Sequence, residues 1–140
     1  PESVEGGYLL LEAAFEADLQ RTISDDGLLT LGMGIRGPDY STDEVVTQDI
    51  ELARELGIPA SMHIGSLGSG GVSKLDELGL LGDDLNYVHG NRLTDEEFQL
   101  IGDSGGSVST TPEVELQMGM GMPALGDAID AGATPSVGVD

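Results

Sequence analysis

The feature that most restricts the fold of this chain is a repeated order of short apolar runs and amphipathic stretches. The apolar runs begin near residues 28, 58, 85, 107 and 135, and a helical pattern lies between consecutive runs. Adjacent parallel strands need a long crossover, which is usually a helix. The sequence therefore predicts an α/β fold with five parallel strands. Periodicity alone leaves open whether they form a doubly wound sheet or part of a (β/α)8 barrel.

Capping residues and glycines set the expected bounds of these segments. Ser41–Glu44 and Thr94–Glu97 have the spacing of capping boxes, and Gly57 and Gly132 follow the ends of two helical patterns. Residues 111–123 are expected to be irregular. The expected strands are 28–35, 58–64, 85–89, 107–110 and 136–140, and the expected helices are 8–20, 42–56, 72–81, 95–101 and 124–131.

The composition excludes several classes of function. The chain has 26 Asp and Glu against 5 Lys and Arg, a net charge of -21, so nucleic acid is not an expected partner. It has no Cys, which excludes disulfides and thiolate metal sites. Its apolar runs are far shorter than the roughly 20 residues that span a bilayer, and it has no basic leader. We expect a soluble, cytoplasmic chain without a membrane partner.

The ends of the sequence suggest a segment of a longer polypeptide. The chain opens on Pro1, and it closes on an apolar run that finishes with Asp140. Domains usually end in exposed, polar residues instead. A partial barrel would leave two open sheet edges, and open edges invite association. We therefore expect a fragment of one domain, with a homo-oligomer as a further expectation.

Three ionisable residues fall at the expected carboxyl ends of strands. They are His63, His89 and Asp140, and they include both histidines of the chain. Side chains at this end of parallel strands converge on the active site of α/β folds. Imidazole and carboxylate are ligands for a zinc-type ion, and they also serve in acid–base chemistry. Taken singly, each residue also fits a structural role, as a hydrogen-bonded histidine or a capping aspartate.

The motifs around these residues resemble the amidohydrolase superfamily, in particular its branch of cytosine deaminases and triazine chlorohydrolases. The matching segments are Met62–Ile64, Val88–Gly90 followed by Leu93–Glu97, Thr111–Glu113 and Gly138–Asp140. The resemblance runs from about Leu28 to Asp140 and corresponds to about the second half of a family member. It implies a partial (β/α)8 TIM-type barrel, strands 4 to 8, with residues 1–140 forming a fragment of one metal-dependent hydrolase domain.

The resemblance also implies a function. The full-length parent would be an enzyme that uses a metal-activated water, with Zn or Fe as the divalent metal, on a C–N or related bond of a small or cyclic molecule. His63, His89 and Asp140 would bind metal. Asp140 would also take the proton of the attacking water, and His89 would polarise the water or substrate. The expected substrate-binding residues are Arg36, Ser66 and Glu113.

The sequence departs from the family pattern at several positions. Ser66 stands where many members carry a glutamate that shuttles protons, and Glu115 stands where an asparagine is frequent. Val139 replaces the usual threonine before the last aspartate. The His-x-His pair of the first barrel strand has no counterpart in these residues. The chain alone is therefore expected to bind metal poorly and to be inactive.

Other motifs keep alternative functions open. Gly32–Gly37 matches the dinucleotide-binding pattern G-x-G-x-x-G, but Pro38–Tyr40 separates it from the next helix. The glycine-rich loop Gly65–Gly71 has the composition of a phosphate-binding loop or of a mobile active-site loop. Met118, Met120 and Met122 would line a pocket or pack within a loop. The alternatives are a noncatalytic α/β domain with structural histidines and a nucleotide-binding doubly wound domain.

Overall fold

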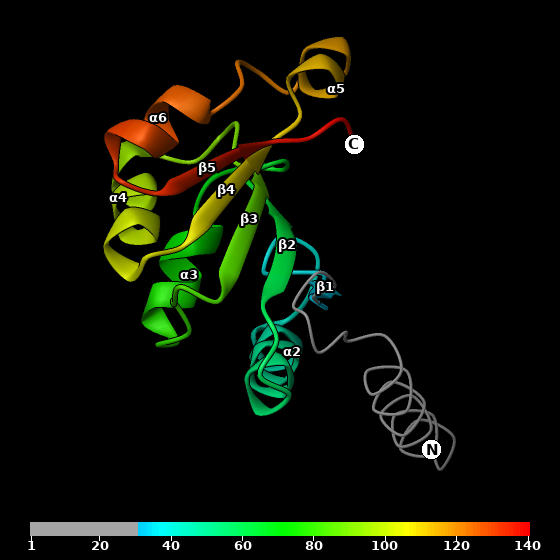
Figure 1. Cartoon of the computed structure of the whole chain (residues 1–140), viewed down its shortest axis with the longest axis vertical. Helices are drawn as coiled ribbons and strands as arrows, with labels where there is room; N and C mark the ends of the chain where they lie inside the picture. The colour runs from blue at the N-terminus through cyan, green and yellow to red at the C-terminus, as the bar shows by residue number, and fades with distance from the viewer. Residues whose placement is uncertain (1–30) are drawn as a thin grey trace, which may run out of the picture. The chain divides into compact units, whose positions relative to one another are not determined.

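The computed structural model describes residues 31–140, in which strands and helices alternate along the chain (Figure 1). Residues 1–30 are outside the described part, and so is the expected helix 8–20. The elements are β1 (Met33–Ile35), α2 (Asp43–Glu55), β2 (Ala60–Ile64), α3 (Gly71–Glu77), β3 (Leu85–His89), α4 (Asp95–Ser104), β4 (Ser107–Thr110), α5 (Pro112–Gln117), α6 (Leu125–Asp130) and β5 (Thr134–Val137).

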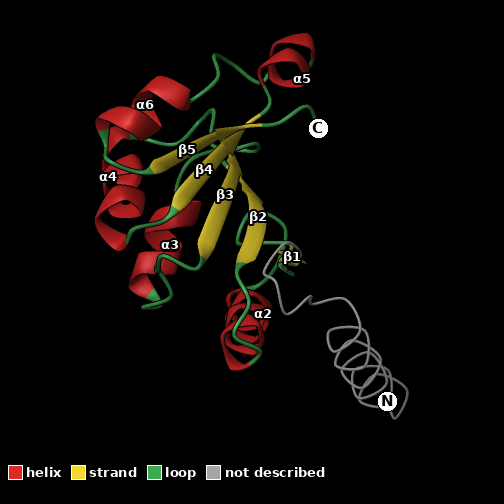
Figure 2. Cartoon of the chain, in the orientation of Figure 1, coloured by secondary structure: helices red, strands yellow, loops and turns green. Residues whose placement is uncertain are grey.

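The five strands form one parallel sheet in the order β1-β2-β3-β4-β5. Each strand pairs with the next one along the chain, so the strand order never reverses. A doubly wound sheet needs such a reversal to create its ligand-binding crevice. Figure 2 shows α3, α4 and α6 together on one side of the sheet. The parallel α/β fold is confirmed, and its sequential order is that of a barrel segment.

Alternation along the strands builds the core on the helix-covered face. In β2, Ala60, Met62 and Ile64 are buried, whereas Ser61 and His63 between them are more exposed. Ile50 of α2 and Ile101 of α4 are fully buried, as is expected for the apolar stripe of a helix that covers a sheet. Burial of this apolar surface is the main stabilising contribution to the sheet.

The opposite face of the sheet carries a row of polar side chains. Asn86 of β3 donates to Ser61 Oγ at 2.9 Å and accepts from Ser107 Oγ and Ser109 Oγ at 3.0 and 2.9 Å. Ser109 and Ser136 are 2.6 Å apart, oxygen to oxygen. The row therefore joins β2, β3, β4 and β5 through side-chain hydrogen bonds. It fixes the register of neighbouring strands on the face that the helices leave uncovered.

One expected capping box is confirmed and the other is wrong. Thr94 caps α4, and Glu97 returns the bond to the Thr94 backbone N–H. At α2 the N-cap is Thr42, whose hydroxyl accepts from Val45 N at 3.4 Å. Ser41 cannot take this role, because its hydroxyl donates to the Gly37 carbonyl at 2.7 Å and closes the preceding turn.

The ends of several elements differ from the expected bounds. β1 begins only at Met33, and residues 28–30 of the expected strand are outside the described part. β5 ends at Val137, so Asp140 lies beyond the strand rather than at its last residue. α3 ends at Glu77, because Gly79 has a φ of 70°. Residues 112–117 form a helix where an irregular stretch was expected, with Pro112 in its first turn.

The glycines of Gly32–Gly37 do not form a dinucleotide-binding loop. β1 runs through the motif, so Gly34 lies within a strand. Gly37 has a φ of 69°, and a Cβ there would lie 3.0 Å from the Cβ of Met62. The close approach of Gly37 to β2 thus explains why a glycine is needed there. The G-x-G-x-x-G pattern therefore no longer supports the nucleotide-binding alternative.

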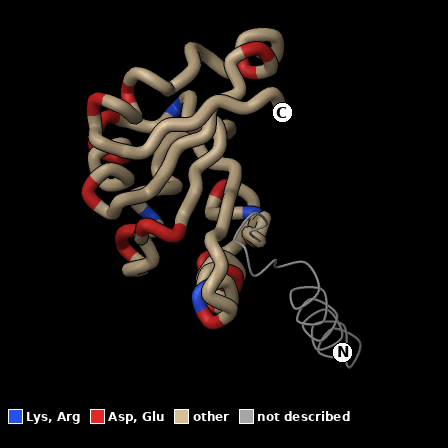
Figure 3. The backbone as a smooth tube through the Cα atoms, viewed as in Figure 1, with Lys and Arg blue, Asp and Glu red and all other residues tan. Residues whose placement is uncertain are grey.

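Acidic residues are spread over several helices and loops rather than gathered in one patch (Figure 3). Asp and Glu occupy the first turn of α2, α4 and α5, where their negative charge interacts favourably with the positive end of the helix dipole. None of the helices described for residues 31–140 has the length and apolar character needed to cross a membrane.

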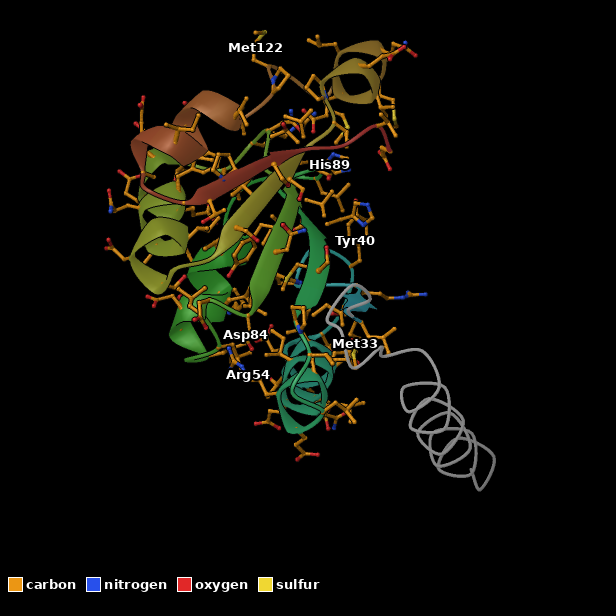
Figure 4. All side chains as sticks on the ribbon, in the orientation of Figure 1. Met33, Tyr40, Arg54, Asp84, His89 and Met122 are labelled. Carbon is orange, nitrogen blue, oxygen red and sulfur yellow. The ribbon has the colours of Figure 1, made fainter. Side chains whose placement is uncertain are left out.

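An ion pair joins α2 to the start of β3. Arg54 Nε lies 2.7 Å from Asp84 Oδ2, and its Nη2 lies 3.1 Å from Oδ1 and 2.7 Å from the Leu80 carbonyl oxygen. Figure 4 places this pair at the end of the sheet opposite His89. The hydrogen bond from Arg54 is the main reason that the pKa of Asp84 lies below its ordinary value, against the opposing effect of burial.

We expect Asp84→Asn to lower the free energy of unfolding by about 1 kcal/mol at pH 7, the value of a bidentate, partly exposed pair. Because the folded state lowers the pKa of Asp84, the stabilisation is complete above the unfolded pKa and is lost as pH falls through the lower folded pKa. Urea unfolding of both proteins between pH 7 and pH 2.5 measures the difference. Asp83→Asn removes the same charge from an exposed neighbour, and an equal effect there would contradict the prediction.

Candidate active site

His89 ends β3 and lies in an unusual backbone conformation. Its φ is 77°, in the left-handed region that non-glycine residues rarely occupy, and Gly90 follows with a φ of 73°. The side chain is 5% exposed. Conformations of this kind cost about 1–3 kcal/mol and concentrate at functional sites. The chain therefore turns sharply after β3 and holds a buried imidazole at the carboxyl end of the sheet (Figure 4).

A buried carboxylate holds one nitrogen of this imidazole. Glu115 Oε1 lies 3.1 Å from His89 Nδ1 and also accepts from the Thr111 backbone N–H at 2.7 Å. Glu115 Oε2 accepts from Asn91 Nδ2 at 3.1 Å. The Glu115 side chain is fully buried. Three elements thus meet here, namely β3 with its following turn, the end of β4 and the short helix α5.

The hydrogen bonds around Glu115 decide its protonation. Burial favours the neutral carboxyl, but the donors from Thr111, Asn91 and His89 together outweigh it, so the pKa of Glu115 lies below its ordinary value. Glu115 is therefore ionised at neutral pH and accepts hydrogen bonds through both oxygens.

His63 brings a second imidazole to the same place. It is the fourth residue of the five in β2 and lies on the face away from the covering helices, where it is exposed. In the register of the sheet, His63 pairs with Val88, and Ile64 pairs with His89. The two imidazole rings stack with centroids 5.2 Å apart and an angle of 28° between their planes.

Asp140 completes the group of expected ligands. Its Oδ2 lies 3.9 Å from His89 Nε2, the nitrogen that Glu115 does not contact, and its side chain is 41% exposed. The backbone leads there from β5 through Gly138, whose N–H donates to the Thr110 carbonyl oxygen at 2.8 Å. The structure therefore gathers His63, His89 and Asp140 at one end of the sheet, as strand-end positions predict.

The donor types of this group suit a divalent ion, but the group is not a closed ligand set. Two imidazoles and one carboxylate match the chemistry of zinc sites. Within residues 31–140, however, no three His, Asp or Glu side chains are close enough to hold an ion as they stand. The fit to a metal is therefore one of donor chemistry and location, and it is only partial.

A hollow beside His63 contains one of the expected substrate-binding residues. It has a volume of about 680 Å³ and lies over β1 and β2, where Arg36, Tyr40 and His63 share its wall with apolar Val88. Arg36 is exposed and follows β1 directly. A cationic side chain and an aromatic ring beside an imidazole suit a small polar or ring-shaped ligand.

The other two expected substrate-binding residues lie in different surroundings. Ser66 follows Gly65 in the loop after β2, and its hydroxyl oxygen is buried without a hydrogen-bond partner among the described residues. Glu113 is exposed on α5 and accepts from Gln117 Nε2 at 3.1 Å. The hollow beside His63 includes neither of them in its wall. Their roles in binding substrate stay predictions.

The glycine-rich loop Gly65–Gly71 is bound to carboxylates, which argues against a phosphate-binding loop. The N–H groups of Gly70 and Val72 donate to Glu97 Oε1 at 2.9 and 3.0 Å. The N–H groups at the start of the loop face Asp39; burial raises the pKa of Asp39 in spite of these donors. The N–H groups where the loop enters α3 are therefore already engaged and not free for a phosphate.

The chain is similar in sequence and in structure to deaminases. The chain is 26% identical to 5'-deoxyadenosine deaminase of Methanopyrus kandleri over 126 residues, which cover 82% of this chain and 29% of that protein. It superposes on a zinc-bound adenosine deaminase from Xanthomonas campestris with a TM-score of 0.75 and 26% identity, covering 91% of this chain and 31% of that one. A further relative is the 5-methylthioadenosine/S-adenosylhomocysteine deaminase of Moorella thermoacetica, which is 25% identical over 82% of this chain and 29% of that protein.

A more distant solved structure shows the same fold. A triazine hydrolase from Arthrobacter aurescens superposes with a TM-score of 0.72 at 19% identity over 86% of this chain and 30% of that one. The neighbours are TIM-barrel amidohydrolases, as expected for a partial barrel. The chain spans less than a third of the length of these relatives. No family model matches the sequence.

Sequence reasoning identified the three strand-end residues but did not include their supporting side chains. Glu115, Asn91 and Thr111 hold His89 in place, yet none was an expected site residue. Glu115 was noticed only as a departure from the asparagine of the amidohydrolase pattern. Nothing in the sequence marks Glu115 as buried, because it lies in α5 and reaches His89 only through the fold.

Proposed function

We propose that this chain is a fragment of one barrel domain in a metal-dependent hydrolase of the deaminase type. The whole enzyme would break a C–N or related bond in a small cyclic molecule. The observation that carries the proposal is the gathering of His63, His89 and Asp140 at the carboxyl end of the sheet. Homology to deaminases supports it, and the zinc in a related structure supports a divalent ion.

In this proposal, different residues of the chain bind the metal, transfer protons and bind the substrate. His63 and Asp140 supply metal-ligand donors, and Asp140 takes the proton of the attacking water. His89 presents Nε2 to the same point and polarises the water or the substrate. A divalent ion held by these donors would supply an acidified water near neutral pH. Arg36 and Tyr40 line the hollow in which a substrate ring fits beside His63.

Tests of this proposal use the full-length protein that contains the chain. We expect it to contain zinc or iron and to release ammonia from 5'-deoxyadenosine or from a related cyclic amine. His63→Ala and Asp140→Asn are each expected to lower metal content and to reduce kcat/KM by at least about 100-fold, as loss of a ligand does. Elemental analysis after gel filtration and an ammonia assay measure the two quantities.

Asp130→Asn is the matched control, because Asp130 is exposed on α6 and the same charge is removed. Its metal content and kcat/KM should equal those of the wild type. Unchanged metal content and activity in both His63→Ala and Asp140→Asn would reject the enzyme proposal. The noncatalytic α/β domain with structural histidines would then be the better explanation.

A further inference from the structure

We infer that Glu115 is a positioning residue that holds the proton of His89 on Nδ1 and so leaves the lone pair of Nε2 free on the side of the ring that faces Asp140. The inference deepens the proposed function, on which its catalytic meaning rests. It concerns a residue at which this sequence departs from the amidohydrolase pattern. Its evidence is the hydrogen-bond geometry around one buried carboxylate.

The orientation of the Glu115 carboxylate is fixed by groups that can donate a hydrogen bond but cannot accept one. A backbone N–H and an amide NH2 can only donate. Thr111 N–H points to Oε1 at 2.7 Å, and Asn91 Nδ2 points to Oε2 at 3.1 Å. Asn91 Nδ2 also donates to the Met122 carbonyl oxygen at 3.0 Å, which prevents its amide from turning over. Both carboxylate oxygens are therefore held as acceptors.

This orientation determines which nitrogen of His89 carries the proton. Oε1 lies 3.1 Å from Nδ1, so an N–H at Nδ1 makes a hydrogen bond. If the proton were on Nε2, the lone pair of Nδ1 would face the lone pairs of a buried carboxylate at the same distance. That contact is repulsive, and it would be strengthened by the low polarity of the surroundings. The Nδ1–H tautomer is therefore the stable one.

Thr111 is the competing partner, since its Oγ1 lies 3.2 Å from Nδ1. A hydroxyl can donate as well as accept, so it is compatible with either tautomer. The same hydroxyl donates to Glu115 Oε1 at 3.3 Å. Of the two partners of Nδ1, only Glu115 discriminates between the tautomers, and Thr111 adds to whichever one Glu115 selects.

The consequence concerns the nitrogen on the other side of the ring. With the proton on Nδ1, Nε2 has a free lone pair, and it lies 3.9 Å from Asp140 Oδ2. An imidazole whose first nitrogen donates to a carboxylate is oriented and more basic at the second. Glu115 thus prepares His89 to bind a metal or to accept a proton, without itself touching either.

The test is the tautomer of His89 in the 140-residue chain without metal. The chain has only two histidines, so long-range proton–nitrogen NMR spectra of nitrogen-15-labelled protein resolve both rings. The spectra are recorded at a pH at which both imidazoles are neutral. We expect His89 as the Nδ1–H form in the wild type, the less common form for an isolated imidazole. A wild-type His89 protonated on Nε2 would overturn the inference without any variant.

Three variants separate Glu115 from its neighbour. Glu115→Ala should invert the tautomer ratio, Glu115→Gln should keep the Nδ1–H form because its carbonyl oxygen still accepts, and Thr111→Val should keep it as well. Inversion in Thr111→Val but not in Glu115→Ala would assign the role to Thr111 and reject Glu115. The His63 resonances report whether a variant has kept its fold. Because the measurement needs no metal or substrate, its result is independent of the proposed hydrolase activity.

Discussion

Replacing Glu97 by alanine is expected to lower the free energy of unfolding by about 3 kcal/mol, although Glu97 lies in the first turn of a helix. The side chain is 1% exposed. Its Oε2 accepts from the Thr94 N–H at 3.2 Å and completes the capping box of α4. Its Oε1 accepts from Gly70 and Val72 at the start of α3. One carboxylate therefore caps two helices.

The size of the effect follows from the donors that alanine would leave. A buried donor without an acceptor costs about 1–3 kcal/mol, and hydrogen bonds to a charged group are at the strong end of the usual range. Of the three N–H donors to Oε1 at the start of α3, the contact with Val72 is buried, whereas those with Gly70 and Ser73 are part-buried. Water can reach part of this site after substitution, so the sum of separate penalties overestimates the loss. Urea unfolding of the wild type and Glu97→Ala measures it.

Glu96→Ala is the matched control, because Glu96 precedes Glu97 in the same helix turn and is exposed. Its substitution should change stability by no more than about 0.5 kcal/mol. Amide exchange adds a local test: the protection of the Gly70 and Val72 amides should fall in Glu97→Ala and stay unchanged in Glu96→Ala. Similar losses of stability in the two variants would show that the hydrogen bonds of the buried Glu97 carboxylate contribute no more to stability than an exposed side chain does.

The role of Glu97 illustrates what local sequence motifs can predict. Thr94–Glu97 predicted a capping box because both partners lie three residues apart in one helix turn. The second set of partners is 24 to 27 residues earlier in the chain, at the start of α3. Only the packing of α3 against α4 brings them together. Spacing within a motif therefore predicted the contact of one carboxylate oxygen, but neither the contacts of the other oxygen nor the burial of the side chain.

In the candidate site, too, residues at strand ends could be predicted from the sequence, whereas a contact between distant segments could not. Strand ends are local features, so His63, His89 and Asp140 could be selected from the sequence, and the parallel sheet places them together. Glu115 lies 26 residues after His89 and reaches it only because α5 follows β4 directly. That helix was expected to be irregular. Its six residues are too few for helical periodicity to reveal.

The bounds of the elements were least predictable where strands lie at the edges of the sheet. β3, in the centre, has the expected bounds 85–89, because β2 pairs with its whole length and β4 pairs with residues 86–88 from the other side. β5 pairs only with β4, and its four residues are exposed. Its end is set by that pairing rather than by hydrophobicity. The apolar run up to Val139 therefore predicted a strand that is longer than the one observed.

The second large effect is expected at Gly102 in α4. Alanine normally stabilises a helix relative to glycine by about 1 kcal/mol. At Gly102, however, an added Cβ would overlap the carbonyl oxygen of Ala131 and lie 2.9 Å from its carbonyl carbon. The obstacle is backbone, which cannot rotate away as a side chain can. We expect Gly102→Ala to lower the free energy of unfolding by about 2–3 kcal/mol, the cost of overpacking a well-packed contact.

Gly126→Ala in α6 is the control with the opposite expected sign. A Cβ at Gly126 would meet nothing within 4 Å, so alanine should stabilise the protein by about 0.5 kcal/mol. Urea unfolding of both variants compares the same substitution in two helices of one molecule. Stabilisation by both would mean that α4 and α6 are not held as closely as the structure indicates.

The position of Gly102 links this contact to the candidate site. Ala131 ends α6, and the chain passes from it through buried Ala133 into β5 and on to Asp140. A Cβ at Gly102 would push the start of that segment away from α4 and change where β5 meets β4. Because Asp140 lies beyond the strand, a shift of β5 moves its carboxylate relative to His89. We therefore expect Gly102→Ala to change the distance between Asp140 and His89 as well as the stability of the sheet.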